Sequence, residues 1–358
     1  HTDGGRAMVF YGSAGGLASS PDWTVDGEES GLDYGYEVAS AGDMDGDGDA
    51  ELLVTINGEG VAGRVDLFLG SVDGLDSVAD DRMEGTDADE GVGAGIAGGG
   101  DLDGDGLADI AITAAVRTWG SSSYGTTGAT WVLYGSESPG LGSHRLQDQS
   151  WTSSSGNFGY SVATGCDVNA DGYDDVAFGV YGSGAASYVL GGADGAESTS
   201  RTLTYSAQTL ACLGDVNGDG YDDIALGTYS SSSTPSVYAF YGSTTGLSTS
   251  RSSALSAGGG SSWGEALVGD LDLDGDGYPD VVVGEPDHRS TANNEGRVVW
   301  YPGGSAGISS TGTTVDVGGV DSTGLGTWLS SAGDVNGDGY DDLLAGAPGW
   351  DGDGADRG

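Results

Sequence analysis

The stretch "GDVNGDGYDD" occurs at residues 214–223 and again, unchanged, at residues 333–342. It holds too many carboxylates and too little apolar surface for a protein core, and each of its glycines costs a helix about 1 kcal/mol. Like charges gathered this closely repel one another, and a bound cation would offset that cost. The stretch therefore predicts a loop that wraps a cation.

Four further stretches follow the same pattern: "GDMDGDGDAE" (42–51), "GDLDGDGLAD" (100–109), "CDVNADGYDD" (166–175) and "LDLDGDGYPD" (271–280). The first acidic residues of the six stretches fall at 43, 101, 167, 215, 272 and 334. The repeating unit is therefore roughly sixty residues long. We call the stretches cage loops 1 to 6 and count positions in each from its first acidic residue.

Each cage loop carries side-chain oxygens at positions 1, 3, 5 and 9 and a glycine at position 6. Oxygen ligands at alternate positions can surround a cation, and the glycine permits the turn that points the carbonyl of position 7 inward. Oxygen-only ligands in a small loop favour calcium over zinc or copper, so we expect up to six Ca²⁺ ions. The candidate metal ligands are Asp43, Asp45, Asp47, Asp49 and Glu51; Asp101, Asp103, Asp105, Leu107 and Asp109; Asp167, Asn169, Asp171, Tyr173 and Asp175; Asp215, Asn217, Asp219, Tyr221 and Asp223; Asp272, Asp274, Asp276, Tyr278 and Asp280; Asp334, Asn336, Asp338, Tyr340 and Asp342.

An EF-hand shares the first half of this loop but requires a bidentate Glu at position 12 and a helix on each side. Here position 12 is apolar and lies in a predicted strand, as Val54, Ile112, Phe178, Leu226, Val283 or Ala345. The EF-hand is therefore rejected. An acidic turn without metal remains the alternative for any single loop, but six copies in register argue against it for the set.

Other features keep step with the cage loops. A glycine stands eight residues before position 1 in five of the six units: Gly35, Gly93, Gly159, Gly264 and Gly326. An apolar strand follows position 9, and an aromatic-rich strand such as "TWVLYG" or "VYAFYG" comes later. This order gives about four short strands per unit, which is one blade of a β-propeller.

The unit resembles the FG-GAP repeat of integrin alpha-subunit propellers and of bacterial surface proteins. The resemblance rests on "FGYSVATGCDVNADGYDDVAFG" (158–179) and "LGTWLSSAGDVNGDGYDDLLAGAP" (325–348). It implies a β-propeller that holds calcium at one face and serves adhesion or ligand recognition rather than catalysis. Three departures stand out: Ala207 replaces the expected glycine, the glycine-rich residues 91–100 predict a loose inner strand, and Asp270 has no assigned role.

We predict an all-β fold, a single β-propeller domain over residues 1–358 with six four-stranded blades, in preference to the seven blades of integrins. The last unit lacks its aromatic strand, and "GGRAMVFYGSAGGL" (4–17) supplies one at the start of the chain. We therefore expect the N-terminal strand to complete the last blade and close the ring. The predicted units span approximately 18–75, 76–140, 141–195, 196–247, 248–307, and 308–358 together with 1–17.

The net charge of −46, with no Lys in the chain, argues against nucleic-acid or acidic-membrane partners. No apolar run reaches the ~18 residues of a membrane span, so we expect no membrane insertion. The chain begins at His1 rather than Met, and we take it as a processed or excised piece. Cys166 and Cys212 precede cage loops 3 and 4, where a disulfide and two buried thiols are equally expected.

No catalytic motif surrounds His1, His144 or His288, so we do not expect an enzyme. We expect an extracellular, secreted or cell-surface calcium-binding module for adhesion, recognition or structure. Its partners would be protein or glycan ligands on a cell surface or matrix, and strand exchange could assemble copies into filaments. The alternative is a calcium-dependent lectin, for which Trp23, Trp151, Trp263 and Trp328 are candidate sugar-stacking residues, although blade packing explains them better.

Overall fold

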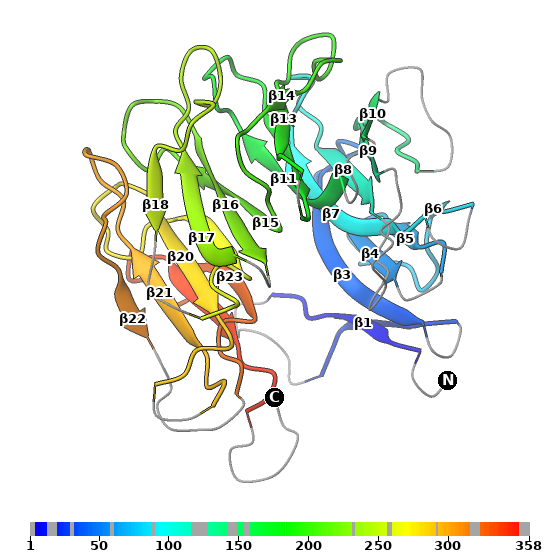
Figure 1. Cartoon of the computed structure of the whole chain (residues 1–358). Coiled ribbons are helices and arrows are strands. Elements are labelled where there is room, and N and C mark those ends of the chain that lie inside the picture. The colour runs from blue at the N-terminus through cyan, green and yellow to red at the C-terminus, as the bar shows by residue number, and fades with distance from the viewer. Residues whose placement is uncertain are drawn as a thin grey trace. The chain divides into compact units, whose positions relative to one another are not determined.

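The structure is a computed structural model that describes residues 4–12, 20–28, 32–57, 61–86, 90–115, 128–141, 149–153, 158–182, 184–230, 233–255, 260–290, 293–315 and 323–350. Within these ranges every regular secondary-structure element is a β-strand, labelled as in Figure 1. No described segment forms a helix long and apolar enough to cross a membrane. The chain divides into two compact units, the first comprising His1–Gly165, Tyr173–Gly184 and Val189–Ser200, and the second Cys166–Gly172, Ala185–Tyr188 and Arg201–Gly358.

The first unit contains two complete four-stranded antiparallel sheets. One has the order β3-β4-β5-β6, with β3 (Asp33–Gly42), β4 (Glu51–Asn57), β5 (Arg64–Phe68) and β6 (Asp81–Glu84). The other has the order β10-β9-β8-β7, with β7 (Val92–Gly100), β8 (Asp109–Ala114), β9 (Gly128–Leu133) and β10 (Gln149–Ser153). In each sheet a cage loop joins the first strand to the second.

The second unit contains two sheets of the same design. One has the order β15-β16-β17-β18, with β15 (Thr209–Gly214), β16 (Asp223–Ser230), β17 (Ser233–Phe240) and β18 (Ser253–Leu255). The other has the order β19-β20-β21-β22, with β19 (Leu267–Leu271), β20 (Asp280–Glu285), β21 (Arg297–Tyr301) and β22 (Thr313–Val315).

A fifth four-stranded sheet and two strand pairs complete the described strands. The sheet has the order β11-β12-β13-β14, with β11 (Phe158–Cys166), β12 (Asp175–Val180), β13 (Ser187–Val189) and β14 (Arg201–Thr202). The pairs are β1 (Arg6–Val9) with β2 (Trp23–Asp26), and β23 (Trp328–Gly333) with β24 (Asp342–Gly346). Four-stranded antiparallel sheets in series are consistent with propeller blades. Each sheet also takes its fourth strand from beyond the sequence-based unit boundary, as β6 shows for the first.

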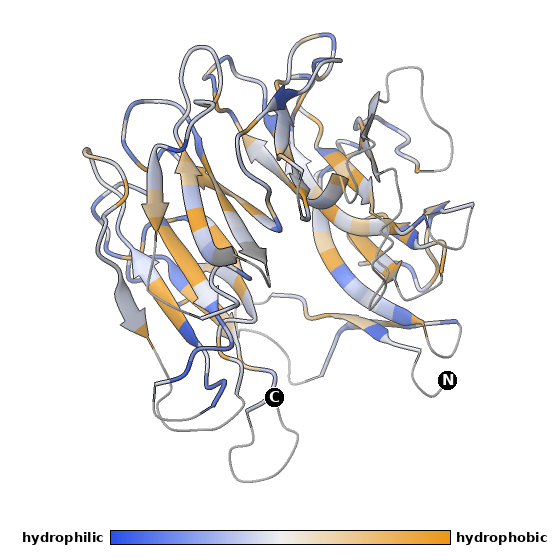
Figure 2. Cartoon of the chain, viewed as in Figure 1, coloured by the Kyte–Doolittle hydropathy of each residue, from blue (hydrophilic) through white to orange (hydrophobic). Residues whose placement is uncertain are grey.

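The second strand of each complete sheet forms the centre of the core. All six residues of β8, β12 and β20 are buried, as expected for strands with apolar layers on both faces. Figure 2 shows the resulting apolar residues along the strands of both units. Trp23, Trp151 and Trp263 are buried in these cores, and the Trp23 ring meets Phe68 edge-on with their centroids 4.9 Å apart.

The backbone explains the glycine that stands eight residues before five of the six cage loops. Gly93 has φ +80°, and a Cβ added there would lie 3.0 Å from Val65 Cγ2. Residues with side chains rarely adopt this conformation, and the space is already filled, so the position requires glycine. The strand register shifts here between Val92 and Gly95, which marks a β-bulge at the start of the inner strand.

The structure shows the setting of each of the three departures from the repeat pattern. The glycine-rich inner strand of the second sequence repeat forms β7, which pairs with β8 from Val92 to Gly100 with two bulges, and the loose strand predicted for it is not observed. Ala207 is fully buried just before β15. Asp270 occupies a bulge in β19 with φ +55°, a left-handed conformation that Asp tolerates better than most residues. The role of Asp270, which had no assignment from the sequence, is therefore to form this bulge.

Cys166 and Cys212 form a disulfide, with their Cα atoms 5.7 Å apart. Of the two states that the sequence left open, the structure contains the bridged one. Cys166 directly precedes position 1 of cage loop 3, and Cys212 lies on the strand that leads into cage loop 4. The bridge therefore ties together the chain segments that enter two successive cage loops.

Candidate metal centres

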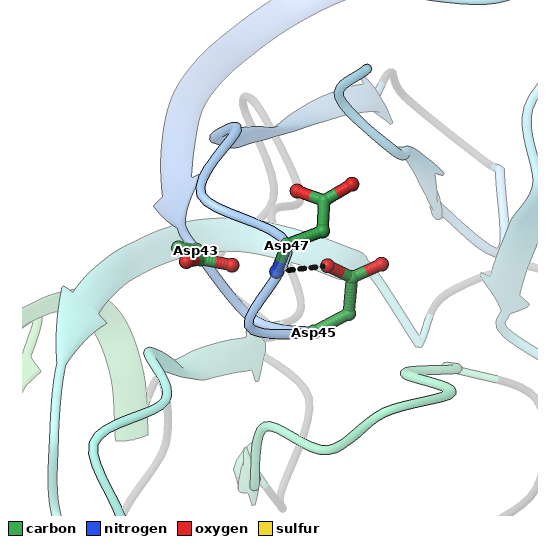
Figure 3. Close-up of side chains that lie close together, drawn as sticks. All are labelled: Asp43, Asp45 and Asp47. Carbon is green, nitrogen blue, oxygen red and sulfur yellow. Dashed lines mark hydrogen bonds between the residues drawn. The ribbon is translucent and has the colours of Figure 1, made fainter. Parts of the chain in front are cut away.

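The carboxylates of three cage loops converge. Oxygen atoms of Asp43, Asp45 and Asp47 lie within 4.8 Å of one another, and the same holds for two further groups. Figure 3 shows the first group on its loop, where the Asp47 amide donates a 3.1 Å hydrogen bond to Asp45 Oδ1. The other groups, in cage loops 2 and 5, are Asp101, Asp103 and Asp109, and Asp272, Asp274 and Asp276.

The position-1 carboxylate shapes each loop. In cage loop 2, Asp101 Oδ1 accepts the amide of Gly104 at 2.7 Å and Asp101 Oδ2 accepts that of Gly106 at 3.0 Å. The position-6 bond recurs in all six loops, with distances between 2.7 and 3.0 Å. Position 6 has a positive φ, +88° at Gly106, which confirms why glycine stands there.

The position-9 carboxylate performs a second task that the sequence did not reveal. Asp109 is fully buried; its Oδ2 accepts the amide of Leu102 at 2.7 Å and its Oδ1 accepts that of Gly135 at 2.8 Å. Gly135 follows β9, so one carboxylate fastens the cage loop to the end of the third strand. The glycine bond recurs at Asp175, Asp223 and Asp280, with distances of 2.8, 2.8 and 2.9 Å, and at Glu51, where it is 3.4 Å.

Burial disfavours the ionised form of these carboxyl groups when no cation is bound. It raises the pKa of Asp109 to about 7 and that of Asp223 to about 8, against the opposing effect of the hydrogen bonds from backbone amides. Burial also raises the pKa of Glu51 and of Asp280. Asp334, the exposed position-1 residue of cage loop 6, differs: backbone hydrogen bonds, with that from Gly339 first, lower its pKa.

These donors fit a calcium ion. Positions 1 and 3 contribute oxygen atoms to all three clusters, together with position 5 in cage loops 1 and 5 and the buried position 9 in cage loop 2, and no nitrogen or sulfur ligand of the described residues joins these clusters. Calcium prefers six to eight oxygen ligands in a flexible loop, and its charge would stabilise the ionised form of a buried carboxylate. The residues that would hold the ion are those named from the sequence; Leu107 and its position-7 equivalents would contribute backbone carbonyls.

Cage loops 3, 4 and 6 share the backbone geometry but carry Asn at position 3. Asn169 Oδ1 accepts the amide of Asp171 at 3.2 Å, as Asp45 does for Asp47 in cage loop 1, while its amide nitrogen donates to Asp171 Oδ2 at 2.8 Å. In cage loop 3, position 9 belongs to the first compact unit and positions 1 to 6 to the second, and each part is described separately. In cage loop 6, the amide of Val335 donates to Asp342 Oδ2 at 2.9 Å.

The sequence places no catalytic motif around the three histidines. His288 lies 3.4 Å from Glu285 through its Nδ1, in a cluster with Arg297 that also pairs with Glu285. His1 and His144 lie outside the described residues. The Trp residues proposed for sugar stacking divide: Trp23, Trp151 and Trp263 are core residues, and Trp328 is 66% exposed on β23.

Sequence comparisons agree with this geometry. A model described as the FG-GAP repeat matches residues 158–196 and 209–242, and one described as an FG-GAP-like repeat matches residues 272–345. The chain carries FG-GAP repeats. Members of the FG-GAP repeat family are generally non-catalytic, and three acidic clusters of this chain resemble FG-GAP calcium sites.

The FG-GAP repeats are distantly homologous to integrin alpha chains. "Integrin alpha-4" of Xenopus laevis is 32% identical over 170 residues, which cover 45% of this chain and 15% of the relative. "Integrin alpha pat-2" of Caenorhabditis briggsae is 31% identical over 118 residues, which cover 31% of this chain and 10% of the relative. The matches thus span a small part of each relative's length.

Proposed function

We propose that this chain is an extracellular calcium-binding β-propeller that serves as a non-catalytic module for adhesion or recognition. The observation that carries the proposal is the convergence of carboxylates in cage loops 1, 2 and 5, on the same backbone framework that the other three loops adopt. The FG-GAP repeats and the distant integrin homology support this function, and the disulfide supports an oxidising, extracellular location.

The direct test is a calcium titration of the purified chain by calorimetry. We expect up to six ions per chain with dissociation constants of about 10⁻⁴–10⁻³ M, as in other extracellular modules. A variant with position 5 changed to Ala in cage loops 1, 2 and 5 (Asp47, Asp105 and Asp276) should lose three of them. Absence of calcium binding by the parent chain would refute the proposal. The ligand class is then tested by comparing protein-coated and glycan-coated surfaces in calcium and in EGTA.

We further propose six blades, with β1 and β2 acting as the third and fourth strands of the last one. Gly5 forms a parallel bridge with Tyr34, as Gly63 does with Val92 and Gly296 with Leu325. The latter two glycines lie just before the third strands β5 and β21. The same bridge at Gly5 supports a third-strand role for β1.

The pair β23–β24 supports the complementary half of that blade. Leu344 is 65% exposed, whereas four of its five equivalents, Leu53, Ala111, Ala225 and Val282, are 0% exposed and the fifth, Ala177, is 5% exposed. Those four residues pair with the third strand at Leu67, Val132, Ala239 and Trp300. If the last blade keeps the common register, Val9 would pair with Leu344. The Gly12 amide would then donate to the remaining oxygen of Asp342, since Gly12 corresponds to Gly135.

Strand exchange between copies would use the same pairing, with β1 and β2 supplied by a second chain. We propose closure within one chain, because both half-blades already belong to the same molecule and no second copy is needed. The lectin alternative is weakened by the burial of Trp23, Trp151 and Trp263, which leaves one of the four nominated rings for a sugar.

A further inference from the structure

The residue at position 8 is no expected calcium ligand, yet in four cage loops it forms a hydrogen bond with the preceding cage loop. It is Asp in three loops, Asp174, Asp222 and Asp341, and it is Ala50, Ala108 or Pro279 in the other three. Position 8 lies between the expected carbonyl ligand at position 7 and the carboxylate ligand at position 9. Calcium that holds those two ligands in place therefore also restricts the residue between them.

The contact is a reciprocal pair of hydrogen bonds. In cage loop 5, the amide of Asp272 at position 1 donates to Asp341 Oδ2 at 2.8 Å, and the amide of Asp341 donates back to the Asp272 carbonyl at 3.0 Å. Two other loop pairs repeat this arrangement. The distances are 2.8 and 2.9 Å between Asp101 and Asp174, and 3.0 and 3.1 Å between Asp167 and Asp222.

The remaining loops interrupt the series. The amide of Ala108 donates to the Asp43 carbonyl at 2.8 Å, but Ala108 has no carboxylate to accept the amide of Asp43. Pro279 has neither a carboxylate nor an N–H group, so it offers Asp215 neither of the two bonds. Hydrogen bonds to a carboxylate are about twice as strong as neutral ones, so the acidic position-8 residue makes the stronger link.

We propose that the position-8 carboxylate couples each cage loop to the one before it, an inference that rests on the proposed calcium function. Calcium that fixes positions 7 and 9 of one loop also fixes position 8, whose carboxylate holds the backbone of position 1 in the preceding loop. Coupling between sites is reciprocal, so each loop of a linked pair raises the other's calcium affinity. Asp174 would link cage loop 3 to cage loop 2, Asp222 cage loop 4 to cage loop 3, and Asp341 cage loop 6 to cage loop 5, whereas Ala108 gives cage loop 1 no carboxylate link to cage loop 2.

One variant contains both the test and its control. Asp219→Ala disables cage loop 4 at position 5. This exposed candidate ligand takes no part in the hydrogen bonds between position 8 of one loop and position 1 of the loop before it. Cage loop 4 is linked to cage loop 3 by Asp222, whereas Pro279 separates it from cage loop 5. Peptide-resolved amide exchange with millisecond labelling, followed across a calcium titration, measures the calcium midpoint of each loop separately.

We expect Asp219→Ala to raise the calcium midpoint of cage loop 3 about five-fold or more and to leave that of cage loop 5 unchanged. Asp338→Ala, which disables cage loop 6, should raise the midpoint of cage loop 5 by a similar factor. In the Asp341→Ala background, Asp338→Ala should have no further effect on cage loop 5, while Asp341→Asn, which retains an acceptor oxygen, should keep part of the coupling.

Equal shifts in cage loops 3 and 5 after Asp219→Ala, or no shift in either, would overturn the coupling. The proposed function fails differently: no cage loop of the parent chain would then gain protection with calcium. The Asp222→Ala variant, with all ligands intact, provides a second measurement should Asp338→Ala not fold. It should remove the coupling between cage loops 3 and 4 and raise the calcium midpoint of both.

Discussion

The Gly135 amide donates a 2.8 Å hydrogen bond to Asp109 Oδ1, and through it a candidate calcium ligand fastens the end of β9 to the start of β8. The same carboxylate accepts the Leu102 amide inside the cage loop. A side chain that belongs both to the metal site and to the strand framework links calcium binding to the stability of the sheet.

Asp109→Ala should therefore destabilise the protein even in EGTA. Two buried amides would lose their acceptor, at a cost of about 1–3 kcal/mol each. Chemical denaturation in EGTA measures the free energy of unfolding. Asp105→Ala in the same loop is the control, because Asp105 is exposed. Equal losses for the two variants would contradict the fastening role of position 9.

Removal of calcium should lower the melting temperature by many degrees. At a calcium concentration ten times the dissociation constant, each site contributes about 1.4 kcal/mol, so six independent sites would contribute about 8 kcal/mol. That is comparable with the whole stability of a domain. Calorimetric melts in calcium and in EGTA measure the difference, and magnesium at the same concentration is the control. Identical melts would exclude the cage loops as calcium sites.

The calcium-free protein should lose stability as the pH rises. The folded-state pKa of Asp109 is raised to about 7 and that of Asp223 to about 8, from an ordinary value of 3.8. Their stabilising contribution is therefore fully present below about pH 4 and disappears as the pH rises through 7 to 8. Unfolding in EGTA at pH 5 and pH 8.5 measures the change. Asp223→Asn should flatten the dependence, whereas Asp73→Asn, at an exposed position outside the cage loops, should leave it as in the parent.

Loss of the disulfide should destabilise the protein by about 2–4 kcal/mol. Cys166 and Cys212 are 46 residues apart in the sequence, and the bond restricts that stretch in the unfolded chain. Denaturation of the parent with and without reductant measures the effect. The Cys166→Ala, Cys212→Ala double variant should match the reduced parent, and mass spectrometry that found two free thiols in the untreated chain would refute the bond.

Ring closure predicts one specific crosslink. With Val9→Cys and Leu344→Cys in the parent background, oxidation should form a bond within one chain, because directly paired strand residues lie about 4.5–5.5 Å apart. Non-reducing electrophoresis should show a monomer; a ladder of oligomers would instead indicate strand exchange. Met8→Cys with Leu344→Cys is one residue out of register and should react poorly. Deletion of residues 1–13 should expose the apolar strand edge and cause opening or aggregation.

The sequence alone determined the repeat, the six cage loops, the EF-hand exclusion and the glycine positions. These features are local: ligand positions follow from spacing along a nine-residue loop, and Gly106 is required by its own φ of +88°. The order of apolar strands around each loop then predicted the four-stranded sheets. The same local reasoning gave one wrong expectation, since pairing with β8 orders the glycine-rich β7 that composition alone suggested to be loose.

Only the tertiary structure decided what each loop contacts beyond itself. The hydrogen bond from the Asp272 amide to the Asp341 carboxylate, the one from the Gly135 amide to Asp109, and the Cys166–Cys212 disulfide join residues between 26 and 69 positions apart. Burial likewise assigned Trp23 and its equivalents to the core. A repeated sequence specifies each unit but contains no direct record of which side chain meets the next unit, because those contacts depend on how successive sheets pack together.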